Sequence, residues 1–574
     1  MRERGTEPAR FSIQLRLNRE NAADSDSSGG TVAAGAAIVL GVALRLWQYL
    51  ANPSIWVDEA AIARNVLDRQ AGGLFAALDY GQVAPPGFLL GVKLSSALFG
   101  GSEYALRLVP LLAGLAGPWL FYLVAREILR PVGSIVAASL FSLAVPLIFF
   151  SSNLKQYSSD VAMALLVLWV ALRIARSPLS ARGAGLYSAL IALSLFVSQA
   201  AVFATAAAGA ALLVDAFSRS LPDRRGRAAL VAFWAVAVLA TVLYGRSVLT
   251  PATAAYLDRF WAHGFMPKAG AWAWLGAAAR SVFAGGGNPN AFEGSLRYPW
   301  SVPFALLVGI GGMSLFVRRA LAGALVVGPI GLALLASALR LYPFHARLCL
   351  FLLPLLLLAL VAGAEQIGSF LRWRPARYLP GLLVPVAIWA FVREPAPWTP
   401  EHLRPVLERM EEHRKQGDAL WVYYGAGQAY AYYSKSRPWP GNLLYSTCDR
   451  ADPRDLLRQV DAERGRPRVW ILMAHASGPF DFDERGMLLG YLETIGRRLD
   501  RFHAPVDDTT RNRAEAALFD LSDPVRLAAT TAERFPIGAV PPSQSWTCYG
   551  TMSPLGATTK TIAAVLGARE GRAP

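Results

Sequence analysis

The sequence predicts a polytopic α-helical membrane protein that ends in a small α/β domain. The chain has 574 residues, of which 54% are hydrophobic and 17% are charged, whereas soluble proteins carry about 25% charged residues. Its apolar residues are gathered in blocks, and a helix of about 20 residues spans a bilayer. The C-terminal part is polar and alternates strand-like with helix-like segments, a pattern typical of α/β domains.

The charge distribution indicates membrane orientation and not nucleic-acid binding. The formal net charge is +16, but the arginines cluster in short gaps between apolar blocks, as the positive-inside rule describes. We therefore expect membrane lipids as partners and no nucleic acid. The three cysteines, Cys349, Cys448 and Cys548, predict neither a metal site nor a disulfide framework.

The elements follow in order along the chain. Residues 1–30 are polar and are expected to form a disordered cytoplasmic tail, so the apolar block behind them is a retained anchor and not a cleaved signal peptide. The transmembrane domain covers 31–393, with about eleven spanning helices. The predicted spans are 31–50, 105–125, 132–150, 159–175, 185–199, 201–217, 228–247, 300–317, 320–339, 347–368 and 378–392.

This order of spans places the arginine clusters in the cytoplasm if the N-terminus lies inside. It requires that 86–99 does not cross the membrane. That stretch is short and carries Lys93, so we expect it to form an interfacial helix. Residues 60–78 are amphipathic and are expected to form a second interfacial helix. Both belong to a first outer loop, 51–104. The span 378–392 is short and holds two prolines, and it decides whether the tail lies outside.

The region 394–574 is expected to form an extracytoplasmic α/β domain. Buried-strand patterns and helical patterns alternate within it, as in small α/β domains. The predicted strands are 419–424, 469–473 and 516–521, and the predicted helices are 401–415, 428–434 and 484–497.

An adjacent acidic pair, Asp58-Glu59, follows the first span and the aromatic residue Trp56. Carboxylates are costly to keep near hydrocarbon, so acids at a membrane surface usually have a function. Trp56 is expected at headgroup depth, where tryptophan is enriched. The alternative is a solvated loop in which Glu59 merely stabilises the following helix through its dipole.

Several further motifs follow the acidic pair in a fixed order. Together they resemble the GT-C glycosyltransferases, in the branch of the protein O-mannosyltransferases and the bacterial aminoarabinose transferase that acts on lipid A. The resemblance covers roughly 31–392. At Lys155-Gln156-Tyr157 the chain departs from the pattern, because many members have an acidic residue and an arginine before the tyrosine. The motifs are Trp56-Val57-Asp58-Glu59, Ala84-Pro85-Pro86-Gly87-Phe88-Leu89-Leu90, Phe99-Gly100-Gly101-Ser102-Glu103-Tyr104-Ala105-Leu106-Arg107, Ser152-Asn153-Leu154-Lys155-Gln156-Tyr157 and His345-Ala346-Arg347-Leu348.

The resemblance implies a GT-C fold and a glycosyltransferase. Such an enzyme moves a hexosyl or pentosyl group from a polyprenyl-phosphate donor to a hydroxyl of a glycan, lipid or protein acceptor, on the outer face of what we expect to be a bacterial inner membrane. The acceptor hydroxyl needs a general base, the role expected of Asp58, and displacement of the phosphate inverts the anomeric carbon. Glu59 would tune Asp58 or bind a divalent cation. No cofactor is required, and two adjacent acids alone do not make a metal site.

The donor phosphate needs cations near the interface. Arginine binds phosphate oxygens bidentately, whereas lysine acts as a point charge. For Arg347 the alternative is snorkelling at a helix end. The candidate phosphate ligands are Arg347, Lys155, Lys93 and Arg64, and Arg347 is expected near an outer-leaflet pocket that also contains Asp58.

Three further residues are substrate-binding candidates: His345, Tyr157 and Gln82. His345 would contact phosphate or acceptor, with a simple polar cap as the alternative. Tyr157 would stack on the donor or belong to the aromatic belt. Gln82 stands beside a proline pair and would contact the sugar.

Two motifs imitate other enzymes. Asp481-Phe482-Asp483 has the spacing of a nucleotide-sugar metal motif, but no adequate nucleotide-binding domain surrounds it, and we expect a solvated loop. Gly425-Ala426-Gly427 follows a predicted strand, but Tyr430 stands where a dinucleotide fingerprint needs its third glycine. A simple strand–helix turn is expected there.

Two other classes of function compete with the transferase. A transporter or flippase of lipid-linked saccharides would place ionisable groups near mid-membrane and often shows repeats of broken helices. In this sequence the acids cluster at one interface and no repeat is visible, which favours the enzyme. A non-catalytic lipid-binding partner is the third interpretation.

Overall fold

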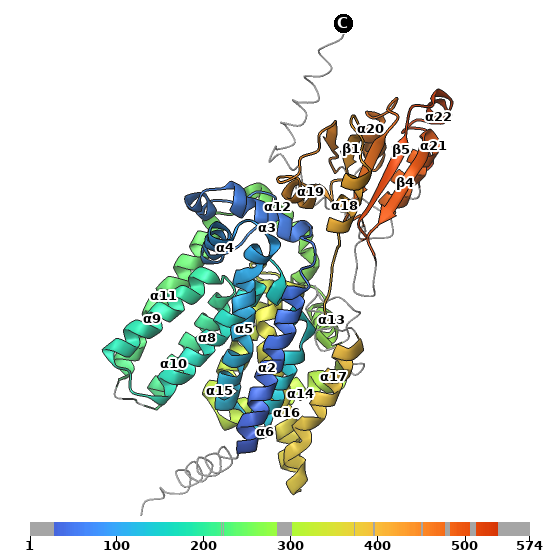
Figure 1. Cartoon of the computed structure of the whole chain (residues 1–574). Helices are drawn as coiled ribbons and strands as arrows, with labels where there is room; N and C mark the ends of the chain where they lie inside the picture. Colours follow the sequence, from blue (N-terminus) through green and yellow to red (C-terminus); the bar gives the residue numbers. More distant parts are fainter. Residues whose placement is uncertain are drawn as a thin grey trace, which may run out of the picture. The chain divides into compact units, whose positions relative to one another are not determined.

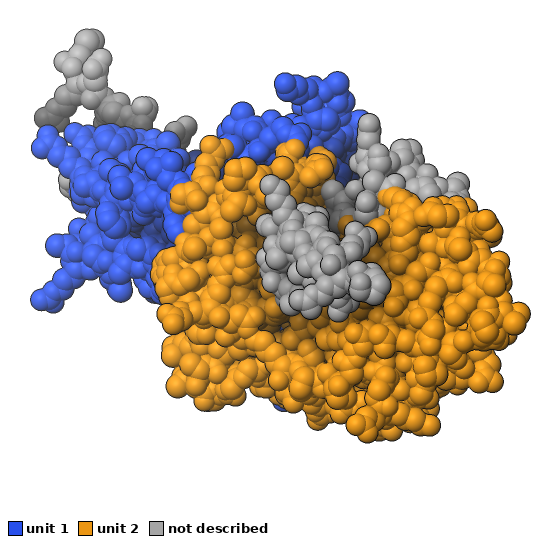
Figure 2. Space-filling view, turned by 90° about the horizontal axis from the view of Figure 1, so that it is seen from above, with its two compact units in different colours: residues 1–50, 107–245, 263–396 blue, residues 51–106, 246–262, 397–574 orange. Residues whose placement is uncertain are grey.

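The computed structural model describes residues 28–219, 221, 223–283, 301–371, 373–393, 396–448, 452–476, 483–505 and 513–537. The predicted N-terminal tail therefore lies almost wholly outside the described residues. The chain divides into two compact units, coloured separately in Figure 2. The helical unit comprises 1–50, 107–245 and 263–396, and the mixed unit comprises 51–106, 246–262 and 397–574.

The helical unit is built from long apolar helices that lie side by side (Figure 1). The ends of α8 suit the helix dipole, with Asp160 in the first turn and Arg173 and Arg176 in the last. The helices are α2 (Ser28–Leu50), α5 (Glu103–Ile128), α6 (Pro131–Leu143), α7 (Val145–Phe149), η2 (Phe150–Ser152), α8 (Tyr157–Arg176), α9 (Ala181–Val197), α10 (Ala201–Ser218), α11 (Arg224–Ser247), η3 (Ala262–Gly264), α13 (Ala271–Phe283), α14 (Ser301–Arg318), α15 (Ala320–Ala338), η4 (Ala346–Leu352), α16 (Leu353–Phe370), η5 (Arg374–Leu382) and α17 (Leu383–Arg393).

All eleven segments predicted to span the membrane are helical. Among the described residues, eight helices are long and apolar enough to cross, and a ninth counts if α6 and α7, bent by 59°, form one span. The remaining two predicted spans correspond to α9 and α14, whose apolar helices are shorter. The predicted class, a polytopic helical membrane protein, is confirmed.

Close helix packing in this unit depends on glycine. α16 packs against α14 and α6, and α10 packs against α8 and α15. At the crossing of α14 and α16, a Cβ at Gly311 would collide with the carbonyl oxygen of Ala359, and one at Gly363 with that of Leu307. Small residues let membrane helices approach closely, which gains dispersion energy where no hydrophobic effect drives association.

The mixed unit joins the loop 51–106 to the C-terminal region. The helix predicted over 86–99 is α4 (Pro86–Phe99), whereas the single helix predicted over 60–78 is divided into α3 (Val57–Asp68) and η1 (Ala71–Phe75). Pro85 and Pro86 begin α4, since proline at the first helical position costs no hydrogen bond. α3 packs against α19 of the C-terminal region, and α12 (Pro251–Phe260) belongs to the same unit.

The C-terminal region is the predicted small α/β fold. Its sheet has the order β2-β1-β3-β5-β4, with β2, β1 and β3 parallel and β5 antiparallel to β3. The elements are α18 (Arg404–His413), β1 (Ala419–Val422), α19 (Gly427–Tyr433), β2 (Leu443–Tyr445), α20 (Arg454–Asp461), β3 (Val469–Met473), α21 (Glu484–Ile495), β4 (Arg497–His503), β5 (Glu515–Asp520) and α22 (Pro524–Ala529).

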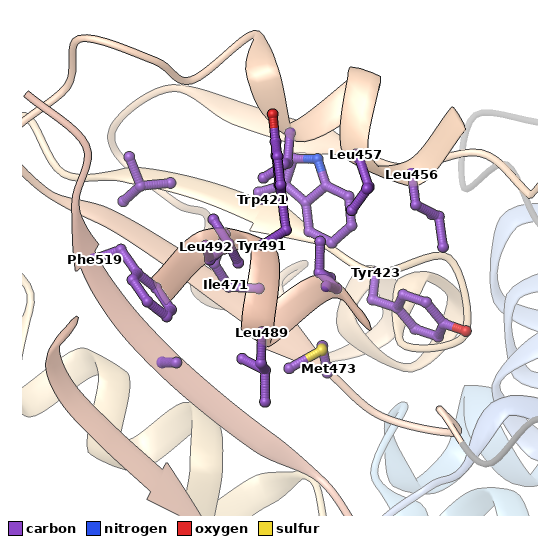
Figure 3. Close-up of a cluster of buried hydrophobic side chains, with 14 of the residues drawn as sticks. Trp421, Tyr423, Leu456, Leu457, Ile471, Met473, Leu489, Tyr491, Leu492 and Phe519 are labelled. Atoms are coloured by element: carbon purple, nitrogen blue, oxygen red, sulfur yellow. The ribbon is translucent and has the colours of Figure 1, made fainter. Parts of the chain in front are cut away.

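The hydrophobic core of this region lies on one face of the sheet. Trp421, Ile471 and Phe519 project from three neighbouring strands and meet Leu457 of α20 and Leu492 of α21 (Figure 3). Every residue of β1 and β3 is buried, as expected for strands covered on both faces.

Two expectations from the sequence need correction. The helix predicted to end at residue 497 ends at Ile495, because Gly496 is extended and leads into β4. Cys448 is disulfide-bonded, so the expectation that the cysteines form no disulfide was wrong. Cys349, by contrast, is a free and buried thiol, as a small core residue should be.

Candidate active site

The acidic pair lies in the first turn of α3. Trp56 is the N-cap residue, and its side chain makes no capping hydrogen bond. The carboxylates of the first turn can therefore stabilise the positive end of the helix dipole. Glu59 is completely buried, whereas Asp58 keeps 9% of its surface exposed. Of the two side chains, Asp58 is the one that retains exposed surface.

The surroundings of the pair come from the C-terminal region as well as the loop. Trp56 is buried, and its ring centroid lies 6.1 Å from that of His475. His475 follows β3, has a left-handed backbone (φ 53°) and places Nδ1 3.4 Å from the buried carboxylate of Glu401. Trp56 is thus packed inside the protein.

Two other candidate site residues of the loop, Arg64 and Gln82, both contact Tyr80. The Arg64 guanidinium lies 4.8 Å from the Tyr80 ring centroid and donates a 3.1 Å hydrogen bond to Gln428 Oε1. Gln82 Nε2 donates to the Tyr80 carbonyl at 3.2 Å. Tyr80 and Gly81 both have positive φ, and the Gln82 backbone N–H donates to the Asp79 carbonyl at 3.3 Å, so residues 79–82 form a tight turn.

Lys93 is anchored on the backbone of α3. From α4, its Nζ donates 2.8 Å hydrogen bonds to the carbonyls of Val66 and Arg69. These carbonyls lie at the C-terminal end of α3, where the last turn leaves acceptors without helical partners and the dipole favours a cation. The structure therefore gives Lys93 a helix-capping contact.

In the helical unit, three candidates form a group around η4. The Arg347 guanidinium lies 5.9 Å from the ring centroid of Tyr157, within the range of a cation–π interaction. The His345 ring meets the His263 ring edge to face, with centroids 4.3 Å apart. Burial, then the neighbouring His263 and Arg347, lower the pKa of His345 to about 4. His345 is therefore neutral at physiological pH and can both donate and accept a hydrogen bond.

Lys155 and Tyr157 are buried at the start of α8. The backbone N–H of Lys155 donates a 2.7 Å hydrogen bond to the Asn153 carbonyl. The Tyr157 ring packs edge to face on the Phe150 ring. The structure thus brings Tyr157, His345 and Arg347 together, with Lys155 two residues from Tyr157.

Neighbours of this group were not found from the sequence. His263 contacts His345, and Tyr342 donates a 2.8 Å hydrogen bond to the carbonyl of Leu348, next to Arg347. Asp160 accepts a 2.6 Å hydrogen bond from Ser198 Oγ. No local pattern links these residues, because each contact joins separate parts of the chain.

The two imitating motifs have local roles. Asp483 caps α21 and accepts from Gly486 N at 2.7 Å, while its partners Asp481 and Phe482 lie outside the described residues. Gly425 and Gly427 form the predicted strand–helix turn between β1 and α19. Within the described part of the chain, no three His, Cys, Asp or Glu side chains gather into a group able to hold a metal ion.

Comparison with models of known protein families gives a match to part of the chain. The model of the dolichyl-phosphate-mannose-protein mannosyltransferase family matches residues 83–250. None of the curated proteins matches the chain.

Two solved structures show weak similarity. One is ArnT from Cupriavidus metallidurans bound to undecaprenyl phosphate, with 14% identity, a TM-score of 0.45, and 86% of this chain and 98% of that chain covered. The other is the archaeal oligosaccharyltransferase AglB from Archaeoglobus fulgidus in complex with an inhibitory peptide and a dolichol-phosphate, with 11% identity, a TM-score of 0.45 and coverages of 82% and 73%. Similarity of this degree transfers neither substrates nor site residues.

The family match falls on the region that carries the Pro-Pro, glycine-rich and Lys155-Gln156-Tyr157 motifs. The family model thereby supports the predicted resemblance to the GT-C glycosyltransferases over residues 83–250.

Proposed function

We propose that this protein transfers a sugar from a polyprenyl-phosphate donor to an acceptor hydroxyl, with inversion, and that Asp58 is the general base. The observation that carries the proposal is the setting of the acidic pair in the first turn of α3, where Glu59 is completely buried and Asp58 keeps 9% of its surface exposed. The family match supports the donor class, since the family is described as using dolichyl-phosphate-mannose.

In the proposed reaction, the acceptor oxygen forms a bond to the anomeric carbon as the bond between that carbon and the phosphate oxygen breaks. The hydroxyl proton moves to the Asp58 carboxylate, which acts as general base. The electron pair of the broken bond stays on the polyprenyl phosphate. Because attack and departure occur on opposite faces, the configuration inverts. Glu59 lies beside Asp58 in the first turn of α3 and would tune it.

The leaving phosphate gains negative charge and needs fixed cations. We assign this role to Arg347, with Lys155, Lys93 and Arg64 as further candidates. Contact with the Tyr157 ring limits the freedom of the Arg347 side chain, and preorganised charge costs no reorganisation during the reaction. Neutral His345 would donate a hydrogen bond to phosphate or acceptor, and Gln82 would contact the sugar.

We further propose that the acidic pair and the C-terminal region face the outside of a bacterial inner membrane. The acceptor would then be a glycan, lipid or protein of the cell envelope. The disulfide at Cys448 supports this side, since disulfides persist in oxidising compartments and are rare in the cytosol.

The Asp58→Asn variant tests the mechanism. It keeps size and polarity but removes basicity, and a positioned general base contributes about 10²–10⁴-fold in rate. We expect turnover to fall by that order while donor binding and folding persist. Asp68→Asn, which changes an acid at the other end of α3, serves as the control. Near-normal turnover of Asp58→Asn would remove Asp58 from the mechanism.

We propose that no cofactor is required. Sugar transfer by the purified protein is therefore expected to continue in excess chelator. If transfer stops and magnesium or manganese restores it, Glu59 becomes a candidate ligand for a divalent cation, because carboxylates are preferred ligands of these ions.

A further inference from the structure

The backbone just before the acidic pair is held by the C-terminal region of the same unit. Ile55 N–H donates a 2.8 Å hydrogen bond to Tyr433 Oη, and the Arg404 backbone N–H donates to Ser54 Oγ at 3.1 Å. The Arg404 guanidinium donates to the Asn52 carbonyl at 3.2 Å. Residues 52–55 are therefore fixed at three points by residues about 350 positions later.

A single carboxylate completes this arrangement. Glu103 Oε1 accepts a 2.7 Å hydrogen bond from Arg404 and a 2.9 Å hydrogen bond from Tyr433 Oη. The Tyr433 hydroxyl thus donates a hydrogen bond to the Glu103 carboxylate and accepts one from the Ile55 N–H. A hydroxyl can satisfy both contacts at once, whereas a phenylalanine at this position could satisfy neither.

The held segment is under local constraint and leads directly into the acids. Asn52 has a left-handed backbone (φ 44°), which persists where surrounding contacts determine it. Ser54 and Ile55 are completely buried, so an unpaired Ile55 N–H would be costly. Ile55 is followed by the N-cap Trp56, and Asp58 lies in the first turn behind it.

We propose that Tyr433 and Arg404, bridged by Glu103, are positioning residues that fix the location of Asp58 through residues 52–55. This rests on the proposed role of Asp58 as general base. The C-terminal region thereby becomes a working part of the transferase. A displacement of about 1 Å at a reacting group can cost about 10²-fold in rate.

The test compares two neighbouring tyrosines in the full-length protein. Tyr433→Phe removes the hydroxyl that holds Ile55. Tyr432→Phe removes a hydroxyl on the same helix, which donates to the Gly101 carbonyl at 2.7 Å. We expect Tyr433→Phe to lower kcat roughly ten- to a hundredfold with little change in KM for the donor, and Tyr432→Phe to keep kcat within about twofold.

The same substitution is then made in an Asp58→Asn background. If Tyr433 acts by placing Asp58, its loss should lower kcat no further once the base is gone, since residues that act as a unit are non-additive. Thermal melting of each variant separates loss of position from loss of folding.

Three results would overturn the inference: wild-type kcat in Tyr433→Phe, equal losses in both tyrosine variants, or a full additional loss in the Asp58→Asn background. Failure of the proposed function is distinguishable, because it appears as normal turnover in Asp58→Asn alone.

Discussion

Arg347 differs from the two lysine candidates because its guanidinium lies against an aromatic ring, a contact that Arg64 also makes, with Tyr80. The Arg347 guanidinium lies against the Tyr157 ring, while Lys93 and Arg64 hold backbone or side-chain groups of their own unit. A guanidinium packed on a ring keeps its N–H fork available to bind an anion in the plane of the guanidinium. This geometry favours Arg347 over the lysines as the phosphate ligand.

Substitution of Arg347 should weaken donor use. A hydrogen bond to a charged group contributes about 1.5–3 kcal/mol, so Arg347→Ala is expected to lower kcat/KM for the donor roughly ten- to a hundredfold. Arg347→Lys should recover only part of the loss, because the bidentate fork is gone. Arg340→Ala is the matched control, since Arg340 lies 4.8 Å over the Phe265 ring. Equal effects at both positions would contradict the assignment.

The lowered pKa of His345 predicts that the stability of the folded protein depends on pH. The pKa of His345 falls from 6.5 to about 4 on folding, so between these values the unfolded chain binds a proton that the folded chain does not. Stability should therefore decline as pH drops from about 6.5 to 4. Melting curves in detergent should show a smaller decline for His345→Gln than for the wild type or for His413→Gln, a change at an exposed histidine. Identical pH profiles in all three proteins would argue against the buried neutral state.

At the scale of elements, α3 is short and depends on its neighbours. It has 12 residues, and isolated helices of that length are marginal in water. Its first turn carries the acids, its C-terminal end is capped by Lys93, and its side contacts α19. Tertiary contacts at both ends therefore hold the helix that presents Asp58.

Lys93→Met tests the capping contact. It keeps the aliphatic stem and removes two charge-assisted hydrogen bonds, so we expect the free energy of unfolding to drop by about 1.5–3 kcal/mol. Lys435→Met removes an exposed pair with Asp68, and such surface pairs contribute about 0–1 kcal/mol. Donor KM should change less than in Arg347→Ala. Unchanged melting combined with a large rise in donor KM would instead place Lys93 at the phosphate.

At the scale of the whole molecule, one unit combines three distant stretches of chain, 51–106, 246–262 and 397–574. The acidic pair comes from the first stretch and its support from the last. A membrane helix region separates them in sequence, and the sidedness of both stretches must agree for this unit to form.

Labelling with an impermeant thiol reagent tests that sidedness. Engineered cysteines at the exposed positions Gln70 and Ser436 should react from outside. One at Ala320 should not, because the positive-inside rule predicts that Arg318 and Arg319 lie in a cytoplasmic loop. The unsubstituted chain is the reference, in which Cys349 is buried and Cys448 is disulfide-bonded. Opposite reactivity of Gln70→Cys and Ser436→Cys would refute the topology.

The sequence by itself determined the helices and the buried strands, because their signals are local. Hydrophobic block length is sufficient to predict a spanning helix, and the continuous apolar runs of β1 and β3 predict buried strands. It also placed Asp58 and Glu59 at a helix start. It did not predict β2, which has three residues, or β4, a charged and largely exposed strand at the sheet edge.

Only the tertiary structure decided which side chains meet. Arg347 reaches Tyr157, Lys93 reaches the end of α3, and Tyr433 joins Glu103 to Ile55 across more than 300 residues. None of these pairs leaves a periodic pattern, because a contact between distant segments depends on the path of the whole chain. The sequence could therefore nominate Asp58 as the base, but the residues that hold it in place became visible only in the fold.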